Sequence, residues 1–376
     1  MIRRALRLVG MIWQILGATA FILIAVFLAV KIPYERFYEN PMLWDQVDNN
    51  DGPHFFWLDS DTLSVVNVRY DRSSRNFIVT ERRLSAAEAR SEMGALGQEL
   101  GQSQFVEDRA CSFQAERIAA VGDIHGKYRH FVALLQKNSI VDTGLDWIWG
   151  SGHLVILGDV FDKGPSVTES LWLIRKLERQ AMKAGGKVHY LLGNHDYLSM
   201  KGFSQSYYPK YGRIADKLRI SYQDLFGKDT EIGLWLRTKN LAVKINGRLF
   251  VHAGFSGSFL DRRVSLEDLN RLAKYSLIGE RPLALSKEER EICRAIWAPD
   301  GPVNYRGYFD RSFPVGFLKV WQGILDQVSG AEKTLNRALH LYDSRQMVVG
   351  HTESKRIQTL YAGKLIAACV RLPTGD

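Results

Sequence analysis

The chain has 376 residues, of which 46% are hydrophobic and 24% charged, enough apolar material to bury one large core or two smaller ones. The composition of a disordered chain, low hydrophobicity with high net charge, is absent. The net charge is +9, but the basic residues are spread along the chain and form no dense block interleaved with aromatic residues. The composition therefore does not favour a nucleic-acid partner.

The three cysteines, Cys111, Cys293 and Cys369, stand far apart in the sequence and form no CxxC pair. This spacing argues against a zinc ribbon and against a scaffold held by disulfides. An odd number leaves at least one thiol free in the monomer, and a Cys111–Cys293 bridge stays open at this point.

Residues 8–30 form an apolar run without an ionisable side chain. As a helix this run would be about 34 Å long, enough to cross a hydrocarbon core of ~30 Å. Arg3, Arg4 and Arg7 precede it, and the positive-inside rule then keeps the N-terminus in the cytoplasm. A cleaved signal peptide would have a shorter apolar region and a small-residue cleavage site. We therefore predict a single-pass anchor in the inner (plasma) membrane, with the rest of the chain extracytoplasmic, or periplasmic in a Gram-negative cell.

Residues 31–50 are polar and aromatic, which is typical of a membrane-proximal linker. Residues 51–114 differ, because three β-branched or aromatic runs alternate there with the short polar segments DSDT and DRSSR. This pattern predicts a small accessory meander. A helix over 85–100 should follow, with Ser85 as its N-cap and Glu88 completing a capping box.

From residue 115 to 376 the pattern becomes one of alternating strands and helices. Apolar strands are predicted at 118–121, 153–158 and 187–192, with helices at 127–138 and 166–185 between them. This is the βαβ order of a sheet covered by helices. Asn246-Gly247 predicts a type I′ hairpin, and a second hairpin is expected around Ala362-Gly363.

Five short motifs stand at the ends of predicted strands: GDIHG (122–126), GDVFDKGP (158–165), GNHD (193–196), VHAG (251–254) and VVGHT (348–352). Taken singly, each motif is weak, since a lone histidine after a strand is more often a hydrogen-bonded core residue. Together they carry Asp, Asn and His to the strand ends, which is the edge of an α/β sheet where ligands bind. We therefore expect these side chains to form one site.

The residues of this site suit metal ions: Asp123, His125, Asp159, Asn194, His252 and His351. Carboxylate and amide oxygens combined with imidazoles favour Mn, Fe or Zn over copper, calcium or a thiolate cluster. Two divalent ions about 3.5–4 Å apart can clamp a phosphoryl group and activate a water. A carboxylate near Asp159 could bridge the two ions.

These motifs resemble the PPP-type phosphoprotein phosphatases of the calcineurin-like metallophosphoesterases, most closely the bacterial branch related to the Shewanella-like phosphatases. The resemblance covers about residues 115–370 and implies an α/β fold, a β-sandwich flanked by helices (αββα). It implies that Asp123 and His125 bind the first metal, that Asp159 bridges both, and that Asn194, His252 and His351 bind the second. It also implies that His195 is the general acid that protonates the leaving group, and that Asp162 orients it.

The resemblance further implies cationic contacts to the substrate phosphate, shared with Asn194. The family carries an arginine where this chain has Lys163, which keeps the charge but loses bidentate geometry. Arg306 lies in a segment, residues 300–309, that resembles the Trp/Tyr-Arg-Gly segment of the Shewanella-like group. The alternative is that Arg306 is a solvated loop arginine. Asp196 stands where many relatives carry Glu and is expected behind the metal ligands.

The function predicted from the sequence is a membrane-anchored, dinuclear-metal phosphatase of phosphoproteins, with phosphotyrosine or phosphoserine and phosphothreonine as targets. The resemblance to the Shewanella-like enzymes favours phosphotyrosine. The nucleophile would be a hydroxide bridging the metals, with His195 as the acid. One alternative keeps the metals but takes a small substrate, such as a dinucleoside polyphosphate or a lipid-linked phosphate. Another is a non-catalytic scaffold that binds phosphorylated partners.

Overall fold

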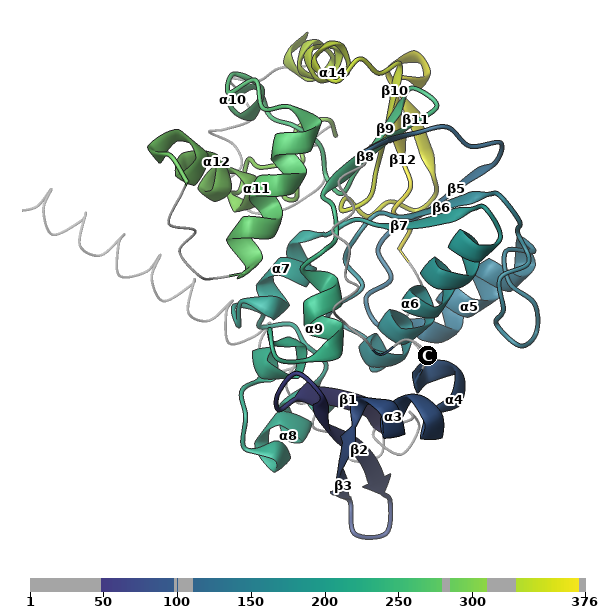
Figure 1. Ribbon diagram of the computed structural model, residues 1–376. Helices are drawn as coiled ribbons and strands as arrows, with labels where there is room; N and C mark the ends of the chain where they lie inside the picture. The colour runs from purple at the N-terminus through teal and green to yellow at the C-terminus, as the bar shows by residue number, and fades with distance from the viewer. Residues whose placement is uncertain (1–48, 98–99, 101–110, 279–284, 310–328, 372–376) are drawn as a thin grey trace, which may run out of the picture. The chain divides into compact units, whose positions relative to one another are not determined.

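The computed structural model describes residues 49–97, 100, 111–278, 285–309 and 329–371 (Figure 1). The predicted membrane segment, residues 8–30, and nearly all of the predicted linker lie outside these ranges. Among the helices that are described, none combines the length and the apolar character needed to cross a bilayer. From residue 50 onward the chain forms one structural unit.

The first element of this unit is a three-stranded antiparallel sheet, β1 (Asp51–Trp57), β2 (Thr62–Asp71) and β3 (Asn76–Ser85). Its apolar side chains are buried on both faces of β2, since the consecutive residues Val65 and Val66 are 3% and 4% exposed. The predicted meander is thereby confirmed. The predicted domain boundary at residue 114 stays a prediction, although β4 (Ser112–Phe113) already pairs with a strand of the main fold.

The helix predicted over residues 85–100 is shorter than expected. Its capping box is confirmed, because the Ser85 side chain accepts from the Glu88 backbone N–H and the Glu88 carboxylate accepts from the Ser85 N–H. However, α3 (Ala86–Glu92) ends there, and α4 (Gly94–Gly97) is a separate turn. Gly94 adopts a φ of 54°, a left-handed conformation that interrupts the helix.

A parallel sheet forms one layer of the main fold: β5 (Ile118–Val121), β6 (His153–Ile156) and β7 (Lys187–Tyr190). The crossovers are α5 (Tyr128–Lys137) and α6 (Val167–Lys183), which lie on the outer face of this sheet (Figure 1). The predicted βαβ order is thus confirmed. All four residues of β6 are buried, and after His153 the strand continues as an unbroken apolar run through Leu157, as expected of a strand covered on both faces.

The second layer is a six-stranded mixed sheet in the order β11-β12-β10-β9-β8-β4. Its remaining strands are β8 (Ala242–Ile245), β9 (Arg248–Val251), β10 (Gln346–Val349), β11 (Gln358–Leu360) and β12 (Leu365–Ala367). Asn246 and Gly247 both have positive φ, at 50° and 68°, as a type I′ hairpin requires. The second predicted hairpin is also present, with the short helix η3 (Tyr361–Gly363) joining β11 to β12.

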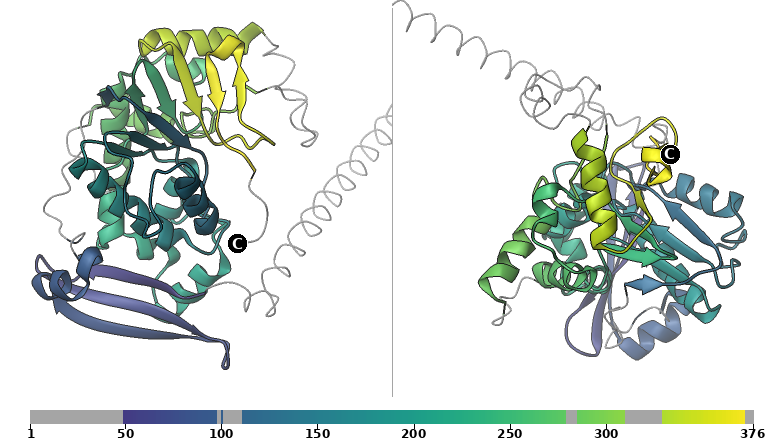
Figure 2. Two further views of the ribbon diagram at one scale, coloured as in Figure 1. Left: turned by 90° about the vertical axis from the view of Figure 1, so that its right-hand side faces the viewer. Right: turned by 90° about the horizontal axis from the view of Figure 1, so that it is seen from above.

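The core of the main fold lies between these two sheets. Val155, Leu157 and Leu191 pack from the parallel layer against Val243 and Phe250 of the mixed layer. Helices flank the sandwich on its outer faces, in agreement with the predicted α/β class (Figure 2). The remaining helices are α7 (Asn194–Met200), α8 (Pro209–Leu218), η2 (Tyr222–Phe226), α9 (Glu231–Leu236), α10 (Gly257–Leu260), α11 (Leu266–Ile278), α12 (Lys287–Trp297) and α14 (Ser329–Leu341).

The cysteines are all free. The Cys111 thiol donates to the Glu267 carboxylate at 3.0 Å, and the Cys293 thiol donates to the Leu272 carbonyl at 3.4 Å. The bridge that the sequence left open between Cys111 and Cys293 is therefore not formed.

Candidate metal centre

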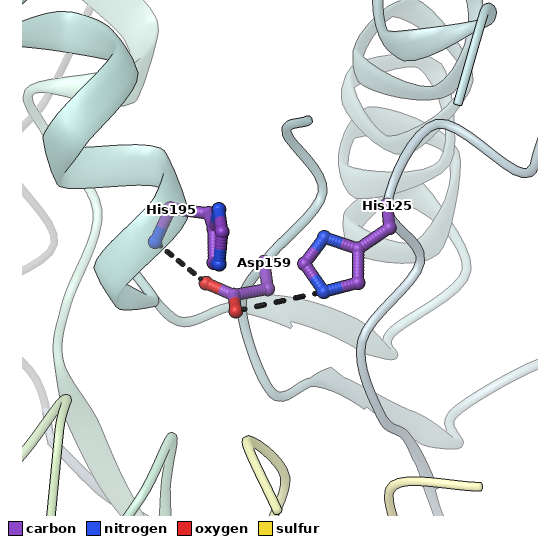
Figure 3. A group of neighbouring side chains, drawn as sticks. All are labelled: His125, Asp159 and His195. Carbon is purple, nitrogen blue, oxygen red and sulfur yellow. Dashed lines mark hydrogen bonds and ion pairs between the residues drawn. The ribbon is translucent and has the colours of Figure 1, made fainter. Parts of the chain in front are cut away.

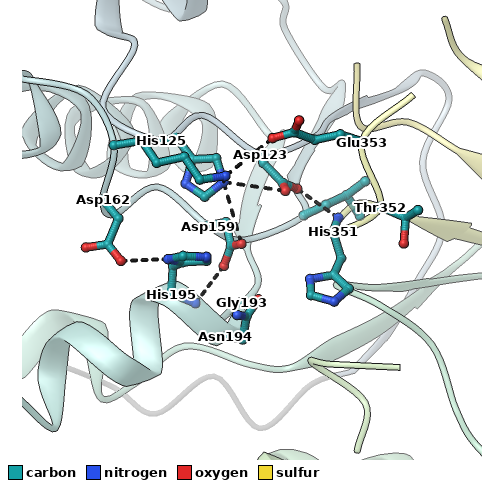
Figure 4. A network of polar contacts seen from close by, with 12 residues as sticks. Asp123, His125, Asp159, Asp162, Gly193, Asn194, His195, His351, Thr352 and Glu353 are labelled. Atoms are coloured by element: carbon teal, nitrogen blue, oxygen red, sulfur yellow. Dashed lines mark hydrogen bonds and ion pairs between the residues drawn. The ribbon is translucent and has the colours of Figure 1, made fainter. Parts of the chain in front are cut away.

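The five sequence motifs meet at one edge of the sandwich, just beyond the carboxyl ends of β5, β6, β7, β9 and β10 (Figure 4). β9 and β10 are parallel neighbours, as are β5, β6 and β7, so their carboxyl ends point the same way. Because the two layers pack face to face, loops far apart in the sequence reach the same place. The structure therefore brings all six predicted metal ligands together, while their roles as ligands stay predictions.

The backbone at this edge is unusually strained. Five of the predicted site residues have φ between 50° and 70°, a left-handed conformation that side chains with a Cβ rarely adopt: His125, Asp159, Asp162, Lys163 and His351. Such conformations cost free energy and concentrate at functional sites. Gly193 permits a close approach, because a Cβ there would stand 2.1 Å from Asp159 Oδ1.

Asp159 lies at the centre of the cluster (Figure 3). Its Oδ2 is 3.8 Å from His125 Nε2 and 3.4 Å from His252 Nε2, so one carboxylate faces both histidines. Its Oδ1 accepts a hydrogen bond from the His195 backbone N–H at 2.9 Å. Two groups of three residues share it, with their ligand atoms within 4.8 Å: His125, Asp159 and His195, and Asp159, His252 and His351.

The other two predicted ligands lie beside these groups. Asp123 Oδ2 is 3.7 Å from His125 Nε2, and Asp123 Oδ1 accepts from the backbone N–H of His351 at 2.9 Å. The amide oxygen of Asn194 is 3.1 Å from His252 Nε2. Each predicted metal set therefore gathers in space, with Asp159 common to both.

The histidine rings are oriented as metal ligands usually are. One ring nitrogen of each faces a backbone carbonyl, for which it must carry a hydrogen. The pairs are His125 Nδ1 with Phe161 O at 2.8 Å, His252 Nδ1 with Leu157 O at 2.6 Å, and His351 Nε2 with Asn304 O at 3.1 Å. The carbonyl sets the tautomer and ring orientation, so that the opposite nitrogen of each ring is the one that would bind a metal ion.

The charges of the cluster also favour a bound cation. Burial lowers the pKa of His125, and it lowers the pKa of His351 to about 2, so both rings are neutral. Burial acts in the same direction on His252, but the charge of Asp159 outweighs it and raises the pKa of His252 to about 9. The buried carboxylate of Asp159 thus favours the protonated form of the His252 ring. A divalent ion at this position would be attracted by the same negative charge. Carboxylates, an amide oxygen and imidazoles fit Mn, Fe or Zn.

His195 and Asp162 form a hydrogen-bonded pair next to the cluster. His195 Nδ1 donates to Asp162 Oδ2 at 2.6 Å, and Asp162 is fully buried. Burial alone would lower the pKa of His195, but the hydrogen bond to Asp162 and the charge of Asp159 outweigh it and raise this pKa. The ring lies edge-on to that of His125, with centroids 4.9 Å apart.

Asp196 stands behind the predicted ligands, as expected from its place in the motif. It is fully buried, and its carboxylate accepts from the backbone N–H groups of Asp159, Val160 and Gly193 at 3.0, 3.0 and 2.8 Å. Burial and the charge of Asp159 nevertheless raise the pKa of Asp196 to about 6. This carboxylate therefore ties the loop after β6 to the start of α7.

The two predicted phosphate contacts are both at this edge. Lys163 Nζ donates to His125 Nε2 at 2.8 Å and lies 3.3 Å from a carboxylate oxygen of Glu353. Arg306 is exposed, but its guanidinium donates to the carbonyl of His351 at 3.3 Å and to the Thr352 hydroxyl at 3.5 Å. The Arg306 side chain is therefore held against the VVGHT loop by hydrogen bonds and does not extend freely into solvent.

Sequence reasoning missed several residues that surround these groups. Glu353 follows the last motif directly and pairs with Lys163 and, at 3.0 Å, with Arg371. Ser199, Ser204 and Ser206 donate hydroxyl hydrogen bonds to Asp162. The nearness of Glu353 to the motif was a usable signal, whereas no pattern in the sequence marks the serines.

Comparisons with known proteins agree with this geometry. The family model for calcineurin-like phosphoesterases matches residues 116–314. An uncharacterized protein of Schizosaccharomyces pombe is 31% identical over 245 residues, 62% of this chain and 66% of that protein. A Shewanella-like protein phosphatase 1 of Plasmodium berghei is 26% identical, over 63% of this chain and 61% of the relative. The chain thus spans just under two thirds of each of these relatives.

A solved structure has the same fold. A cold-active protein-tyrosine phosphatase of a psychrophilic Shewanella species superposes with a TM-score of 0.66 at 27% identity, covering 85% of this chain and 89% of that one. The predicted resemblance and the predicted enzyme class, a phosphoric ester hydrolase, are both confirmed. The chain therefore belongs to the calcineurin-like phosphoesterase family and resembles its Shewanella-like protein phosphatases.

Proposed function

We propose that this protein is a dinuclear-metal phosphatase that hydrolyses phosphomonoesters on proteins, phosphotyrosine included. One observation carries the proposal. A single buried carboxylate, Asp159, faces histidines on both sides, while a separate hydrogen-bonded pair, His195 and Asp162, stands next to it. Metal binding and proton donation are thus assigned to different side chains within one small volume.

The metal ligands in this proposal are Asp123, His125 and Asp159 on one side, and Asp159, Asn194, His252 and His351 on the other. Two divalent ions, when bound, supply charge neutralisation for the phosphoryl oxygens and an activated water. Lys163 must release its hydrogen bond to His125 Nε2 when that nitrogen takes a metal ion. Its ammonium then remains near Glu353, where it can meet a phosphate oxygen.

His195 donates the proton that the leaving group needs. Its Nδ1 is held by Asp162, so its Nε2 is the nitrogen that can carry a proton to the leaving oxygen. The raised pKa of His195 keeps this ring protonated more readily than an ordinary histidine. General acid catalysis of this kind contributes about 10²–10⁴-fold, most of it for esters with a poor leaving group.

In this proposal the substrate phosphate is bound by two cationic side chains, Arg306 and Lys163, and by the amide of Asn194. Arg306 offers a planar fork of donors suited to bidentate contact, whereas Lys163 offers a compact point charge. The amide nitrogen of Asn194 is turned away from His252, since the oxygen is the atom near that ring, and is available to a phosphoryl oxygen. The substrate class follows the names of the relatives, which include a protein-tyrosine phosphatase and a Shewanella-like protein phosphatase.

The proposal includes an anchor in the plasma membrane, supported by the uncharged run of residues 8–30 and the arginines before it. The full chain should sediment with membranes and resist extraction by salt or alkali. A chain lacking residues 1–30 should be recovered without detergent. Recovery of the full chain in the soluble fraction would contradict the anchor and leave the phosphatase proposal untouched.

The test of the activity uses the full chain in detergent, loaded with Mn, Fe or Zn. Release of phosphate is measured from a phosphotyrosine peptide, a phosphoserine peptide and diadenosine tetraphosphate. We expect turnover of the phosphopeptides, fastest with phosphotyrosine. Turnover of the dinucleotide alone would replace the proposal with a small-molecule hydrolase, and metal binding without turnover of any ester would indicate a non-catalytic scaffold.

A further inference from the structure

The carboxylate of Asp162 accepts more hydrogen bonds than its role as a partner of His195 requires. Ser199 Oγ donates to Oδ1 at 3.2 Å, while Ser204 Oγ and Ser206 Oγ donate to Oδ2 at 2.6 and 3.1 Å. The same Oδ2 accepts from His195 Nδ1 at 2.6 Å. A carboxylate has about four lone-pair sites, so Asp162 has little acceptor capacity to spare.

The three hydroxyls approach from two directions. Ser199 lies on α7, three residues after the GNHD motif, and Ser204 and Ser206 lie on the segment that follows this helix. Ser199 and Ser204 are buried and Ser206 is half-buried, so water competes little for these bonds. Hydrogen bonds from both sides prevent the carboxylate from rotating about its Cβ–Cγ bond.

The segment with Ser204 and Ser206 also holds the neighbouring residue. The backbone N–H of Lys163 donates to the carbonyl of Ser206 at 2.9 Å, and the Ser206 N–H donates to Ser204 Oγ at 3.3 Å. Asp162 and Lys163 both have left-handed backbones, with φ of 70° and 62°. A strained pair of residues persists only where its surroundings determine it, and these contacts do so.

We infer that Ser199, Ser204 and Ser206 are positioning residues for the proposed general acid: they lock the orientation of the Asp162 carboxylate, which in turn aims the ring of His195 at the leaving oxygen. The inference rests on the proposed function. It goes beyond the pair of His195 and Asp162, because the serines of α7 and of the segment after it would determine how precisely the His195 ring is oriented. Catalytic groups need such support to stay within a fraction of an ångström of their working position.

A role in folding alone and a role in aiming the acid differ in one measurable respect. An ester with a poor leaving group, such as a phosphoserine peptide, needs a proton in the transition state, whereas 2,4-dinitrophenyl phosphate hardly does. A wrongly oriented His195 ring therefore slows hydrolysis of the phosphoserine peptide but not that of 2,4-dinitrophenyl phosphate. A general loosening of the fold slows both esters alike and lowers the melting temperature.

The experiment compares Ser206→Ala and the double variant Ser204→Ala/Ser206→Ala with the wild type, as full chains loaded with Mn. For the double variant we expect kcat on the phosphoserine peptide to fall about 10-fold or more, and kcat on 2,4-dinitrophenyl phosphate to change by less than about 2-fold. Ser206→Thr keeps the hydroxyl and should restore the rate on the peptide. Ser73→Ala is the matched control, because Ser73 also donates to an aspartate, Asp71, at 2.8 Å, in the exposed β2–β3 turn.

Equal losses on the two esters, or no loss on either, would overturn the inference and leave the proposed function standing. Failure of Ser206→Thr to restore the rate would also overturn it, since the hydroxyl would then not be the group that matters. If the double variant does not fold, the single variant Ser206→Ala decides, because its side chain is only half-buried. A wild type inactive on both esters would instead refute the proposed function, and this inference with it.

Discussion

Two buried clusters of charged side chains in this protein differ in the groups that face their carboxylates: a lysine in one and histidines in the other. At the junction between the first sheet and the main fold, Asp51 and Lys210 are both fully buried side chains with 3.2 Å between Oδ1 and Nζ. His54 and Thr168 donate to the other carboxylate oxygen at 2.8 and 3.2 Å. In this cluster a lysine of the chain itself faces the carboxylate, and its effect is to attach β1 to α6 and α8.

At the candidate metal centre the acids face imidazoles instead: the pKa values of His125 and His351 are lowered, and that of His252 is raised by Asp159. Asp159 is 1% exposed, whereas the cationic side chains that contact the predicted ligands are at least part-exposed: Lys163, which is shared with Glu353, and Arg306, which donates to the His351 carbonyl. A buried charge without a partner costs several kcal/mol, so such an arrangement persists where an ion completes it. A charge cluster that attaches two parts of the fold thus differs from the cluster that we propose binds metal ions.

The largest expected effect comes from removing the carboxylate shared by the two ligand groups. Asp159→Asn should reduce phosphatase activity by about 10³-fold or more and lower the bound metal, because both groups lose a ligand. Its melting temperature without metal should fall, because the attraction between the Asp159 carboxylate and the His252 ring is lost. Phosphate release and metal content by mass spectrometry test this, with the exposed Asp343→Asn as control. Full metal content with full activity would contradict the shared-ligand assignment.

His195→Asn should separate proton donation from metal binding. We expect bound metal to be unchanged and turnover of a phosphoserine peptide to fall about 10²–10⁴-fold, since the leaving alkoxide loses its acid. The exposed His340→Asn, at the end of α14, should behave as the wild type. Loss of metal in His195→Asn would place this ring among the ligands, as its closeness to His125 and Asp159 allows.

Lys210→Met tests the cluster around Asp51. Removing one partner of a buried ion pair leaves Asp51 without its cation, and the free energy of unfolding should fall by about 3–5 kcal/mol. Metal content and kcat of the folded fraction should stay near the wild-type values, because the cluster serves the fold. Denaturant titration measures the loss. Unchanged stability would mean that His54 and Thr168 suffice to satisfy Asp51.

The smallest effect concerns pH. Burial would raise the pKa of Asp51, but the charges of Lys210 and His54 outweigh it and lower this pKa. A carboxyl whose folded pKa lies below its unfolded value, about 3.9, stabilises the fold above that pH and loses this contribution as the pH falls further. Stability should therefore drop below about pH 4, and Asp51→Asn should flatten this part of the profile. If the wild type and Asp51→Asn lost the same stability below about pH 4, the loss would come from other carboxyl groups.

Much of this molecule could be predicted from local sequence patterns. Asn246-Gly247 identifies its hairpin because only a few residues tolerate two consecutive positive φ values. Ser85 and Glu88 mark the start of α3 because a capping box is a contact between near neighbours. The end of that helix was missed, since Gly94 can be accommodated within a helix or can break one. The local sequence does not decide between these outcomes.

The candidate site divides in the same way. The sequence by itself determined which eight side chains to expect together, the six predicted ligands with His195 and Asp162, because they stand in short motifs at strand ends and match those of a known family; their roles stay predictions. Only the tertiary structure decided what surrounds them. Glu353 forms an ion pair with Lys163, and Arg306 donates a hydrogen bond to the carbonyl of His351. Three serine hydroxyls donate hydrogen bonds to Asp162. The physical reason is the separation in sequence between the interacting residues. A motif records which atoms a segment offers, whereas the partners of those atoms come from segments that meet only when the two sheets pack together.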